Sequence, residues 1–587
     1  MKLSNYVIDF LVSEKITHVF EVAGGSFAHL MDSLYGRKDI SSISMHHETA
    51  AAFAAEGYSR AGGNMGVAMA TSGPGATNLI TGIGSCFFDS IPALFITGQV
   101  NTYEFKFNRP VRQVGFQETD IVSIVKPLVK DAFLVTEPDK IRYYLEKAFH
   151  KARNGRPGPV LMDIPLNIQR ADINAGTLKS FDRHTDDEST GGIERIAEEV
   201  FQLIKSSSRP VILAGGGVRL AKASGELIEF AVKTGIPIVS SLMGLDAFPH
   251  DENYFAGMIG TYGNRYANLT IANSDLVLVL GSRLDTRQTG TKPETFARGA
   301  KIVHVDIDPY ELNNKVNADM AVNCDLKSFL FCINRCLHDY DYSRIDSWRK
   351  TVKRYMGCYP SYERSNDAHM DPNFLMHELS GFLPEDGVIC ADVGQNQIWA
   401  AQSLEIKRNQ RFLTQGGMAS MGSALSMAIG ASFANPSKTI VVITGDGGFQ
   451  LNLQELQTIY HHRLPIKIVL LNNSCYGMVR QFQKQYFNNR CQSTVEGYSA
   501  PDFHDIVSAY KISACTVRKN GEIPGALRLL FENNNPYFLE FMIDSNINCM
   551  PKLSVNMPVE EQEPLLPRKE FESLMIVEPW KHDEKSQ

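Results

Sequence analysis

The sequence predicts an α/β protein that contains three doubly wound parallel-sheet domains. Short apolar runs that are typical of buried strands alternate with segments of helical periodicity, which favours parallel sheets covered by helices. Two polar stretches, residues 182–192 and 364–371, interrupt this alternation and read as linkers. A chain of 587 residues has room for about three to four domains.

The predicted elements follow in order along the chain. The first domain, residues 1–180, opens with an amphipathic helix over residues 3–12 and has strands at residues 67–71, 93–97 and 159–163. The second domain, residues 193–345, has strands at residues 210–214, 276–280 and 302–306. The third domain, residues 370–550, has strands at residues 387–391, 440–444 and 466–471. The tail, residues 551–587, is rich in proline and acidic residues and is expected to lie over the surface.

Composition excludes several classes of function. The net charge is −7 and the pI is about 6.1, so the chain has no overall basic field for nucleic acid. No apolar run is long enough to span a bilayer, and the N-terminus does not resemble a signal peptide. The ten cysteines are scattered without a CxxC pair, as expected for reduced thiols in the cytoplasm.

The most informative motif is Gly445-Asp446-Gly447, followed after 24 residues by Asn472-Asn473. Each part follows an apolar run that reads as a strand, and glycines allow a backbone to approach a diphosphate closely. Carboxylate and amide oxygens suit a hard cation such as Mg²⁺. In isolation the tripeptide could be only a turn between a strand and a helix.

The pattern resembles the metal–diphosphate motif of thiamine-diphosphate (ThDP) enzymes. That resemblance implies that Asp446, Asn473 and the backbone carbonyl of Cys475 hold the metal. It also implies that the diphosphate lies against Gly447, Gly448, Gly477 and Met478. Such a protein makes or breaks a bond beside a carbonyl, with thiamine as the electron sink.

A second motif is His46-His47-Glu48, at the start of an alanine-rich helical segment. Glu48 alone could be a favourable charge at a helix N-terminus. Beside a ThDP motif, it is the candidate carboxylate that contacts N1′ of the aminopyrimidine ring and promotes loss of the C2 proton. The two histidines are given no proton-transfer role. The turn at residues 71–78, rich in glycine and proline, points backbone amides into a cavity and by itself is a general anion-binding turn.

The resemblance then extends to the acetohydroxyacid synthase (acetolactate synthase) family of ThDP enzymes. It runs in order from about residue 1 to residue 550 and is carried by the following segments: Gly24-Gly25, His47-Glu48, residues 70–78, 89–92, 98–100, 116–118, 155–159, 242–244, 281–287, 304–309, Met421-Gly422 and residues 477–479.

Membership of that family implies an aminopyrimidine-binding (PYR) domain, a central domain and a diphosphate-binding (PP) domain. It implies a homodimer or homotetramer in which Glu48 of one subunit faces the PP domain of the other.

The same resemblance assigns individual residues. Met421 matches the apolar residue that bends ThDP. Gly394, Gln395 and Asn396 match the stretch that contacts the diphosphate, although the family usually has histidine at position 396. The remaining matches are Gln117 as a catalytic residue and Gly25, Ser26, Phe116 and Phe482 as substrate-contacting residues.

The central domain of this family binds FAD in a structural role. The matching residues are Arg156, Gly215, Gly216, Gly217, Leu242, Met243, Gly263, Gly281, Arg283, Asp306, Ile307 and Asp325. Without the resemblance, the three glycines could be an ordinary turn, and Arg283 could be a surface residue.

Three departures from the family pattern concern the acceptor. Phe482 stands where synthases of amino-acid biosynthesis carry tryptophan, which favours 2-oxobutyrate. The smaller ring could admit a different acceptor, or the change could be a packing substitution alone. The loop at residues 101–113 is longer than usual and carries Lys106, Arg109 and Arg112, which could meet a phosphorylated acceptor or be ordinary solvated residues. Ser26 replaces alanine, and the tail over residues 551–568 differs from the usual ending. These features are similar to those of synthase-like enzymes that acetylate keto-deoxysugar nucleotides.

The sequence therefore predicts a cytoplasmic carboligase that depends on ThDP and Mg²⁺ and carries FAD. It would decarboxylate pyruvate and transfer the acetyl unit to a second carbonyl substrate, which is another pyruvate in the formation of 2-acetolactate. Alternatives are acetyl transfer to a keto-deoxysugar nucleotide, a non-oxidative decarboxylase or lyase, and a non-catalytic protein of the same fold. No nucleic acid or membrane partner is expected, and the sequence does not specify a small regulatory subunit.

Overall fold

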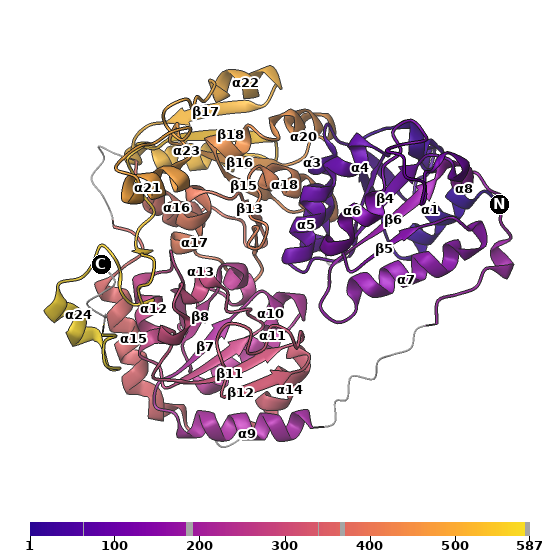
Figure 1. The fold of residues 1–587 in the computed structure, drawn as a ribbon. Coiled ribbons are helices and arrows are strands. Elements are labelled where there is room, and N and C mark those ends of the chain that lie inside the picture. Colours follow the sequence, from indigo (N-terminus) through magenta and orange to yellow (C-terminus); the bar gives the residue numbers. More distant parts are fainter. Residues whose placement is uncertain (63, 183–191, 338–339, 364–369, 582–587) are drawn as a thin grey trace.

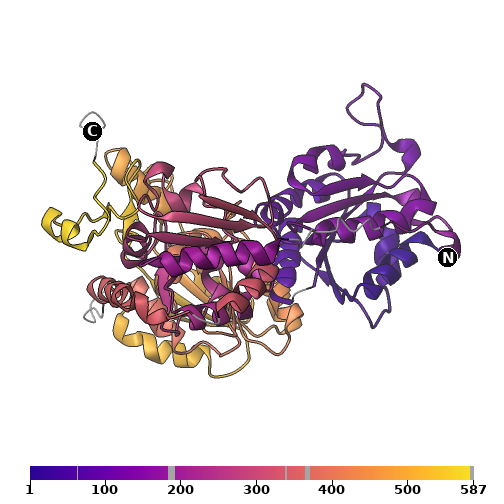
Figure 2. The ribbon, with the colours of Figure 1, turned by 90° about the horizontal axis from the view of Figure 1, so that it is seen from below.

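Three six-stranded sheets, all parallel, form the framework of the protein and confirm the predicted α/β class. The computed structural model describes residues 1–62, 64–182, 192–337, 340–363 and 370–581. Most of the two predicted linkers, residues 182–192 and 364–371, lies outside the described residues. The first domain lies to one side of the other two (Figures 1 and 2).

The first sheet has the strand order β2-β1-β3-β4-β6-β5. Its strands are β1 (His18–Glu21), β2 (Ser41–Ser44), β3 (Gly66–Ala70), β4 (Ala93–Gln99), β5 (Asp131–Leu134) and β6 (Pro159–Pro165). Its helices are α1 (Leu3–Ser13), α2 (Ala28–Leu34), α3 (Glu48–Gly62), α4 (Pro74–Asn78), α5 (Ile80–Phe88), α6 (Ile121–Val125), α7 (Ile141–Arg153) and α8 (Leu166–Gln169).

The third sheet repeats this topology, with the order β14-β13-β15-β16-β18-β17. Its strands are β13 (Val388–Ala391), β14 (Arg411–Leu413), β15 (Ile440–Gly445), β16 (Ile466–Asn472), β17 (Ser513–Val517) and β18 (Tyr537–Met542). Its helices are α16 (Pro372–Ser380), α17 (Gln395–Ser403), α18 (Ser423–Ala434), α19 (Asp446–Phe449), α20 (Leu456–His462), α21 (Gly477–Tyr486), α22 (Phe503–Ala509) and α23 (Ile523–Leu530).

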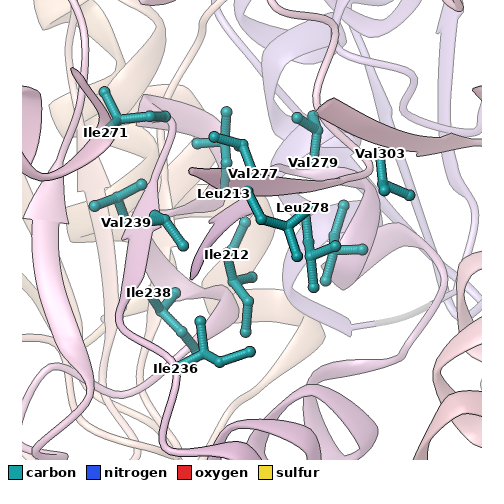
Figure 3. Packing of buried hydrophobic residues seen from close by; sticks show 14 of the residues in the cluster. Ile212, Leu213, Ile236, Ile238, Val239, Ile271, Val277, Leu278, Val279 and Val303 are labelled. Atoms are coloured by element: carbon teal, nitrogen blue, oxygen red, sulfur yellow. The ribbon is translucent and has the colours of Figure 1, made fainter. Parts of the chain in front are cut away.

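The central sheet has a different order, β12-β11-β10-β7-β8-β9, and packs its own core of branched aliphatic side chains (Figure 3). Its strands are β7 (Pro210–Ala214), β8 (Ile238–Ser240), β9 (Phe255–Met258), β10 (Leu276–Leu280), β11 (Lys301–Asp306) and β12 (Met320–Asn323). Its helices are α9 (Ile193–Ser206), α10 (Gly217–Leu220), α11 (Ser224–Thr234), α12 (Arg265–Ala272), α13 (Thr286–Thr289), α14 (Leu326–Cys336) and α15 (Asp346–Cys358). Renumbered within the domain, the order is 3-2-1-4-5-6, which is that of dinucleotide-binding domains.

The tail is built into the central domain, which corrects the expectation that it only lies over the surface. It forms the antiparallel pair β19 (Lys552–Leu553) and β20 (Gln562–Glu563) and the helix α24 (Arg568–Leu574). Leu553, Val559 and Leu574 join the central hydrophobic core. The carbonyl oxygen of Leu574 accepts a hydrogen bond from Tyr355 Oη at 2.6 Å. Apolar side chains at intervals along an acidic, proline-rich segment are enough to anchor it.

The first and third domains share one hydrophobic core, although the whole central domain lies between them in the chain. The contact is the crossing of α3 and α18, which lie between the two sheets (Figure 1). A Cβ atom at Gly430 would lie 1.8 Å from the carbonyl oxygen of Ala54, and one at Gly57 would lie 2.1 Å from that of Met427. The two glycines therefore set the close approach of the helices.

We expect Gly430→Ala to destabilise the protein by about 3 kcal/mol, because the added methyl group meets backbone that cannot move independently. Thermal unfolding followed by circular dichroism measures the loss. Gly225→Ala in α11 is the matched control, because a Cβ atom there meets nothing within 4 Å. That substitution should leave stability unchanged or raise it by up to about 1 kcal/mol. Equal midpoints for the two variants would contradict the role of the crossing.

None of the helices in the described residues has both the length and the apolar composition of a membrane span. All ten cysteines are free thiols.

Candidate active site

The metal–diphosphate motif lies at the carboxyl edge of the third sheet. β15 and β16 are neighbours, with Gly445 opposite Leu471, so Asp446 and Asn473 emerge side by side where the two strands end. Both side chains are buried. Oxygen donors from adjacent strand ends at this edge can hold one hard cation between them.

Tyr498 belongs to this site and was not predicted. Its hydroxyl group donates a hydrogen bond of 2.6 Å to Asp446 Oδ2. Burial raises the pKa of Asp446 to about 6, and the Tyr498 hydroxyl and nearby amides oppose that rise. A buried carboxylate with a raised pKa is poised to take a cation in place of a proton. No local signal in the sequence points to Tyr498, which comes from a loop 52 residues further along the chain.

The glycines around the motif leave no space for side chains. A Cβ atom at Gly447 would lie 2.4 Å from Tyr476 Cε1 and 3.4 Å from the methyl group of Met421. One at Gly477 would lie 1.8 Å from Gln395 Oε1. Gln395 in turn accepts a hydrogen bond of 2.8 Å from Asn473 Nδ2. The structure thus brings these predicted coenzyme residues together, and a cradle of glycine backbone beside oxygen donors fits a metal-bound diphosphate.

The cradle lies at the topological switch point between β13 and β15, where such sheets bind ligands. Gly394 follows β13 with a φ of 156°, and the side chain of Asn396 donates to the carbonyl oxygen of Asp392 at 2.7 Å. Asp392, another residue not predicted, is fully buried and accepts the backbone N–H of Gly422 at 2.9 Å. The sequence signal that could have identified Asp392 is an aspartate directly after an apolar run and two residues before Gly394. Gly448 packs against it, since a Cβ atom there would lie 1.9 Å from Asp392 Oδ2.

Cys475 and Met478 complete this part of the site. Cys475 is buried, and its backbone N–H donates to Asn473 Oδ1 at 3.3 Å. Burial raises the pKa of its thiol to about 11, so the side chain is a neutral packing group. Met478 is partly buried against the core of the third domain.

Glu48 is the first residue of α3, in the first domain. The Nδ1 atom of His47 accepts the backbone N–H of Thr49 at 3.1 Å, which starts the helix at this point. Among the residues that the structure describes, Asn78 alone hydrogen-bonds the Glu48 carboxylate, at 2.9 Å. A Cβ atom at Gly75 would lie 3.2 Å from Glu48 Oε1. The turn at residues 71–78 therefore orients the carboxylate.

Ser26, where the family pattern has alanine, ties that turn to the loop after β1. Its Oγ atom lies 2.8 Å from Thr71 Oγ1 and accepts the backbone N–H of Ser72 at 2.6 Å. A Cβ atom at the neighbouring Gly25 would meet nothing within 4 Å. The loop after β1 thus meets the loop after β3 at the switch point of the first sheet.

The predicted pocket residues Phe116 and Gln117 end the long loop after β4. Gln117 has a φ of 63° and packs on Gly73, whose added Cβ would lie 3.1 Å from its side chain. The side chain of Phe116 is 86% exposed. The buried carboxylate of Glu118 shapes the loop by accepting the backbone N–H of Lys106 at 2.7 Å and of Val114 at 2.6 Å.

Phe482 lies on α21 in an exposed aromatic cluster with Tyr486, at a centroid distance of 4.7 Å, and Phe487, at 5.7 Å. Two glutamines of α21 bind the segment at residues 549–552. Gln481 Oε1 accepts the N–H of Cys549 at 3.0 Å, and Gln485 hydrogen-bonds Lys552. The divergent tail therefore fixes the helix that carries Phe482.

The residues predicted to bind FAD gather mainly at the switch point of the central sheet. Gly215, Gly216 and Gly217 follow β7 and pack on Gly281, which follows β10 with a φ of 60°. A cavity beside the glycines, between the central and third domains, is lined by Leu242, Met243, Arg283, Tyr262, Ile398 and Gly416, among others. Gly263 follows β9 and packs tightly on Ile259.

Four predicted residues stand apart from that cavity. Asp306 and Ile307 lie at the end of β11, and burial raises the pKa of Asp306. Arg156 pairs with Glu311 at 2.6 Å and with Asp308 at 3.0 Å. The carboxylate of Asp325 caps α14 by accepting the N–H of Ser328 at 2.8 Å.

Comparison with known proteins agrees with the architecture. Three family models match: the N-terminal binding domain of thiamine pyrophosphate enzymes over residues 1–124, their central domain over residues 197–333, and their C-terminal binding domain over residues 392–541. Thiamine pyrophosphate is another name for ThDP.

Curated relatives span nearly the whole chain. The large subunit of acetolactate synthase isozyme 2 of Escherichia coli is 37% identical over 558 residues, covering 94% of this chain and 97% of the relative. The acetolactate synthase large subunit of Cyanidium caldarium is 34% identical, covering 93% and 94%. A probable acetolactate synthase large subunit of Methanocaldococcus jannaschii is 35% identical, covering 93% and 92%. The chain therefore belongs to the acetolactate synthase large-subunit family of thiamine-diphosphate enzymes.

Proposed function

We propose that the protein is a carboligase that depends on ThDP and Mg²⁺, decarboxylates pyruvate and transfers the acetyl unit to an acceptor carbonyl. With a second pyruvate as acceptor, the product is 2-acetolactate. The observation that carries the proposal is the pair of oxygen donors, Asp446 and Asn473, at the ends of the neighbouring strands β15 and β16 in a chain that belongs to this family. The domains would be PYR (residues 1–180), central (193–345) and PP (370–550), followed by the tail (551–587).

In this proposal, the PP domain holds the coenzyme. Asp446, Asn473 and the carbonyl oxygen of Cys475 would hold Mg²⁺, and the hydrogen bond from Tyr498 keeps the Asp446 carboxylate in place. Amides of Gly447, Gly448, Gly477 and Met478 and the stretch 394–396 face the diphosphate. When bound, ThDP supplies the electron sink for the carbon that loses CO₂.

Glu48 performs the proton chemistry. Its carboxylate is half-buried at the N-terminus of α3, where Asn78 orients it, and it would hold a proton at the aminopyrimidine ring. Gln117, held by its positive φ against Gly73, would orient the substrate. Gly25, Ser26 and Phe116 line the approach.

The direct test is incubation of the purified protein with pyruvate, Mg²⁺ and ThDP, followed by assays of CO₂ and acetolactate. We expect both products. Failure to consume pyruvate, with or without added acceptors, contradicts the proposal. Turnover of a different 2-oxoacid or an acyl-CoA substrate instead would favour a decarboxylase or lyase.

A second candidate acceptor is a keto-deoxysugar nucleotide. The observation that favours it is the loop before Phe116, where Lys106, Arg109 and Arg112 form no ion pair with any carboxylate in the described parts of the chain. Unpaired cations beside a reaction pocket suit a phosphorylated acceptor. Mass spectrometry of products formed from pyruvate with a panel of 2-oxoacids and keto-sugar nucleotides distinguishes the two acceptors.

Phe482 is expected to set the choice between small acceptors. In equal concentrations of pyruvate and 2-oxobutyrate, Phe482→Trp should raise the proportion of the 2-oxobutyrate product about 10-fold, because a larger ring refills the acceptor pocket. Product ratios measure the effect. Phe487→Trp, in the same cluster, is the matched control and should leave the ratio unchanged. A similar shift in both variants would contradict the assignment.

FAD in the central domain is also part of the proposal. Its support is the dinucleotide-binding strand order, with glycines at the switch point between β7 and β10. Leu242, Met243 and Arg283 line the adjoining cavity. The absorbance spectrum of the purified protein, before and after addition of FAD, tests it: no flavin band and no retention of added FAD would contradict it.

We also propose a homodimer or larger homo-oligomer with shared active sites. Within the described residues of a single chain, Glu48 has one hydrogen-bond partner, and Phe116, Val479 and Phe482 are exposed beside the site. A second copy would cover them. Coexpression of a Glu48→Gln chain with an Asp446→Ala chain tests this arrangement. Random pairing gives half heterodimers, each with one intact site of two, so about one quarter of the wild-type activity should return. No recovery would place each site within one chain.

A further inference from the structure

The loop that carries Met421 lies where all three domains meet. Residues 414–422 join β14 to α18, and Met421 packs beside Gly447 of the coenzyme cradle. A Cβ atom at Gly416 would lie 2.6 Å from Met243 of the central domain, and one at Gly417 would lie 2.4 Å from Phe88 of the first domain. Ala419 has a φ of 54°, a left-handed conformation that is unfavourable for alanine.

The loop has few hydrogen bonds of its own to maintain this conformation. In the described parts of the chain, the N–H groups of residues 416–420 make no backbone–backbone hydrogen bond. Both ends of the loop are hydrogen-bonded within the third domain. Gln397 donates to the hydroxyl group of Thr414, and Asp392 accepts the N–H of Gly422. The middle of the loop is not tied in this way.

Two carboxylates of the first domain hold the loop, one through backbone amides and one through a side chain. Asp89, at the end of α5, accepts the N–H of Gly417 through Oδ1 at 2.8 Å and the N–H of Gly416 through Oδ2 at 3.1 Å. Glu56 accepts the side-chain amide of Gln415 at 3.2 Å. Gln415 then accepts the N–H of Ser420 at 2.9 Å, next to Met421. All these bonds are buried or partly buried, so water does not replace them readily.

We infer that Asp89 is a positioning residue for the coenzyme, acting through the loop 414–422 and Met421. Only a carboxylate offers two equivalent acceptor oxygens to two successive amides. The inference rests on the proposed function, because it assigns Met421 to ThDP. It adds that the first domain shapes the coenzyme cradle of the third domain within the same chain.

Loss of Asp89 should leave the protein folded. Arg60, the buried cation 4.0 Å from Asp89, keeps Glu56 at 3.0 Å and the carbonyl oxygen of Thr414 at 2.7 Å. No buried charge is therefore left unpaired. The crossing of α3 and α18 does not involve Asp89.

The test is calorimetric titration of ThDP into the Mg²⁺-containing protein, together with the ThDP dependence of activity. Asp89→Ala should weaken ThDP binding about 10- to 100-fold, because two hydrogen bonds to a charged acceptor are lost. Asp89→Asn keeps one acceptor oxygen, so its ThDP affinity should lie between that of wild type and that of Asp89→Ala. At saturating ThDP, the kcat of both variants should lie within about 2-fold of wild type, because Asp89 touches no reacting group.

Asp246→Asn is the matched control. Asp246 is a buried carboxylate that accepts the N–H of Phe412 at 3.2 Å, in the strand just before the loop, and pairs with Arg411. This variant should lower the unfolding temperature without changing the ThDP half-saturation. If Asp89→Ala fails to fold, the comparison of Asp89→Asn with Asp246→Asn decides the question.

Two outcomes overturn the inference. One is wild-type ThDP affinity in folded Asp89→Ala, and the other is equal loss of affinity in Asp89→Asn and Asp246→Asn. Failure of the wild-type protein itself to bind ThDP would instead overturn the proposed function.

Discussion

Glu48→Gln should reduce turnover of pyruvate by about 10²- to 10⁴-fold, the usual contribution of a positioned acid–base group. Glutamine has the shape of glutamate and keeps an acceptor for Asn78 at 2.9 Å, so the turn at residues 71–78 should stay in place. A carboxamide cannot exchange a proton with the coenzyme ring as a carboxyl group can. Binding of ThDP should therefore remain within a few-fold of wild type, since the diphosphate end is untouched.

The measurements are steady-state release of CO₂ and calorimetric titration of ThDP. Glu137→Gln is the matched control, because Glu137 is an exposed carboxylate of the same domain that pairs only with Lys140 in the described residues. It should show wild-type activity. Activity of Glu48→Gln above about one tenth of wild type would refute the role of Glu48.

Asp446→Ala should abolish coenzyme binding that depends on Mg²⁺, with a loss of at least about 100-fold in metal affinity. Removal of a residue that only supports a ligand already costs 10- to 100-fold, and Asp446 is the one charged ligand proposed. The variant should fold as well as wild type without ligands. The reason is that the buried carboxylate, with a pKa raised to about 6, is costly to keep ionised in the absence of a cation.

Thermal unfolding separates the loss of coenzyme binding from any loss of folding stability. Saturating Mg²⁺ and ThDP should raise the melting temperature of wild type, since a ligand at 100 times its Kd adds about 2.7 kcal/mol to stability. The same ligands should leave the melting temperature of Asp446→Ala unchanged. A chelator should return wild type to its ligand-free midpoint, and added Mg²⁺ should restore the increase. Asp502→Ala, at an exposed carboxylate of the same domain, is the control. A normal thermal shift in Asp446→Ala would contradict the metal assignment.

Pattern reading of the sequence found three interior strands in each sheet and missed every edge strand, together with the interior strands β1, β8 and β18. β4, β10 and β16 are buried on both faces, so they appear as largely apolar runs, although the buried Lys467 interrupts β16. β2, with the sequence Ser-Ser-Ile-Ser, and β14, with three residues, lie at sheet edges and have no such run. An edge strand is specified mainly by the neighbour it pairs with, and that neighbour is far away in sequence.

The composition of the tail also failed to predict its packing. Its acidic and proline-rich composition suggested a surface segment, yet Leu553, Val559 and Leu574 enter the central core. Composition averages over a segment, whereas anchoring depends on a few apolar positions.

The sequence by itself determined the fold class and the two ends of the candidate coenzyme site. The Gly445–Asn473 motif is local, because each half lies directly after its strand, and Glu48 begins its helix. Their chemistry can therefore be read from neighbouring residues. Only the tertiary structure decided which distant groups support them: Tyr498 on Asp446, Asp392 on Gly422, and Asp89 on the loop before Met421. Hydrogen bonds between residues 30 to more than 300 positions apart depend on how the sheets pack, and no local pattern in the chain encodes them.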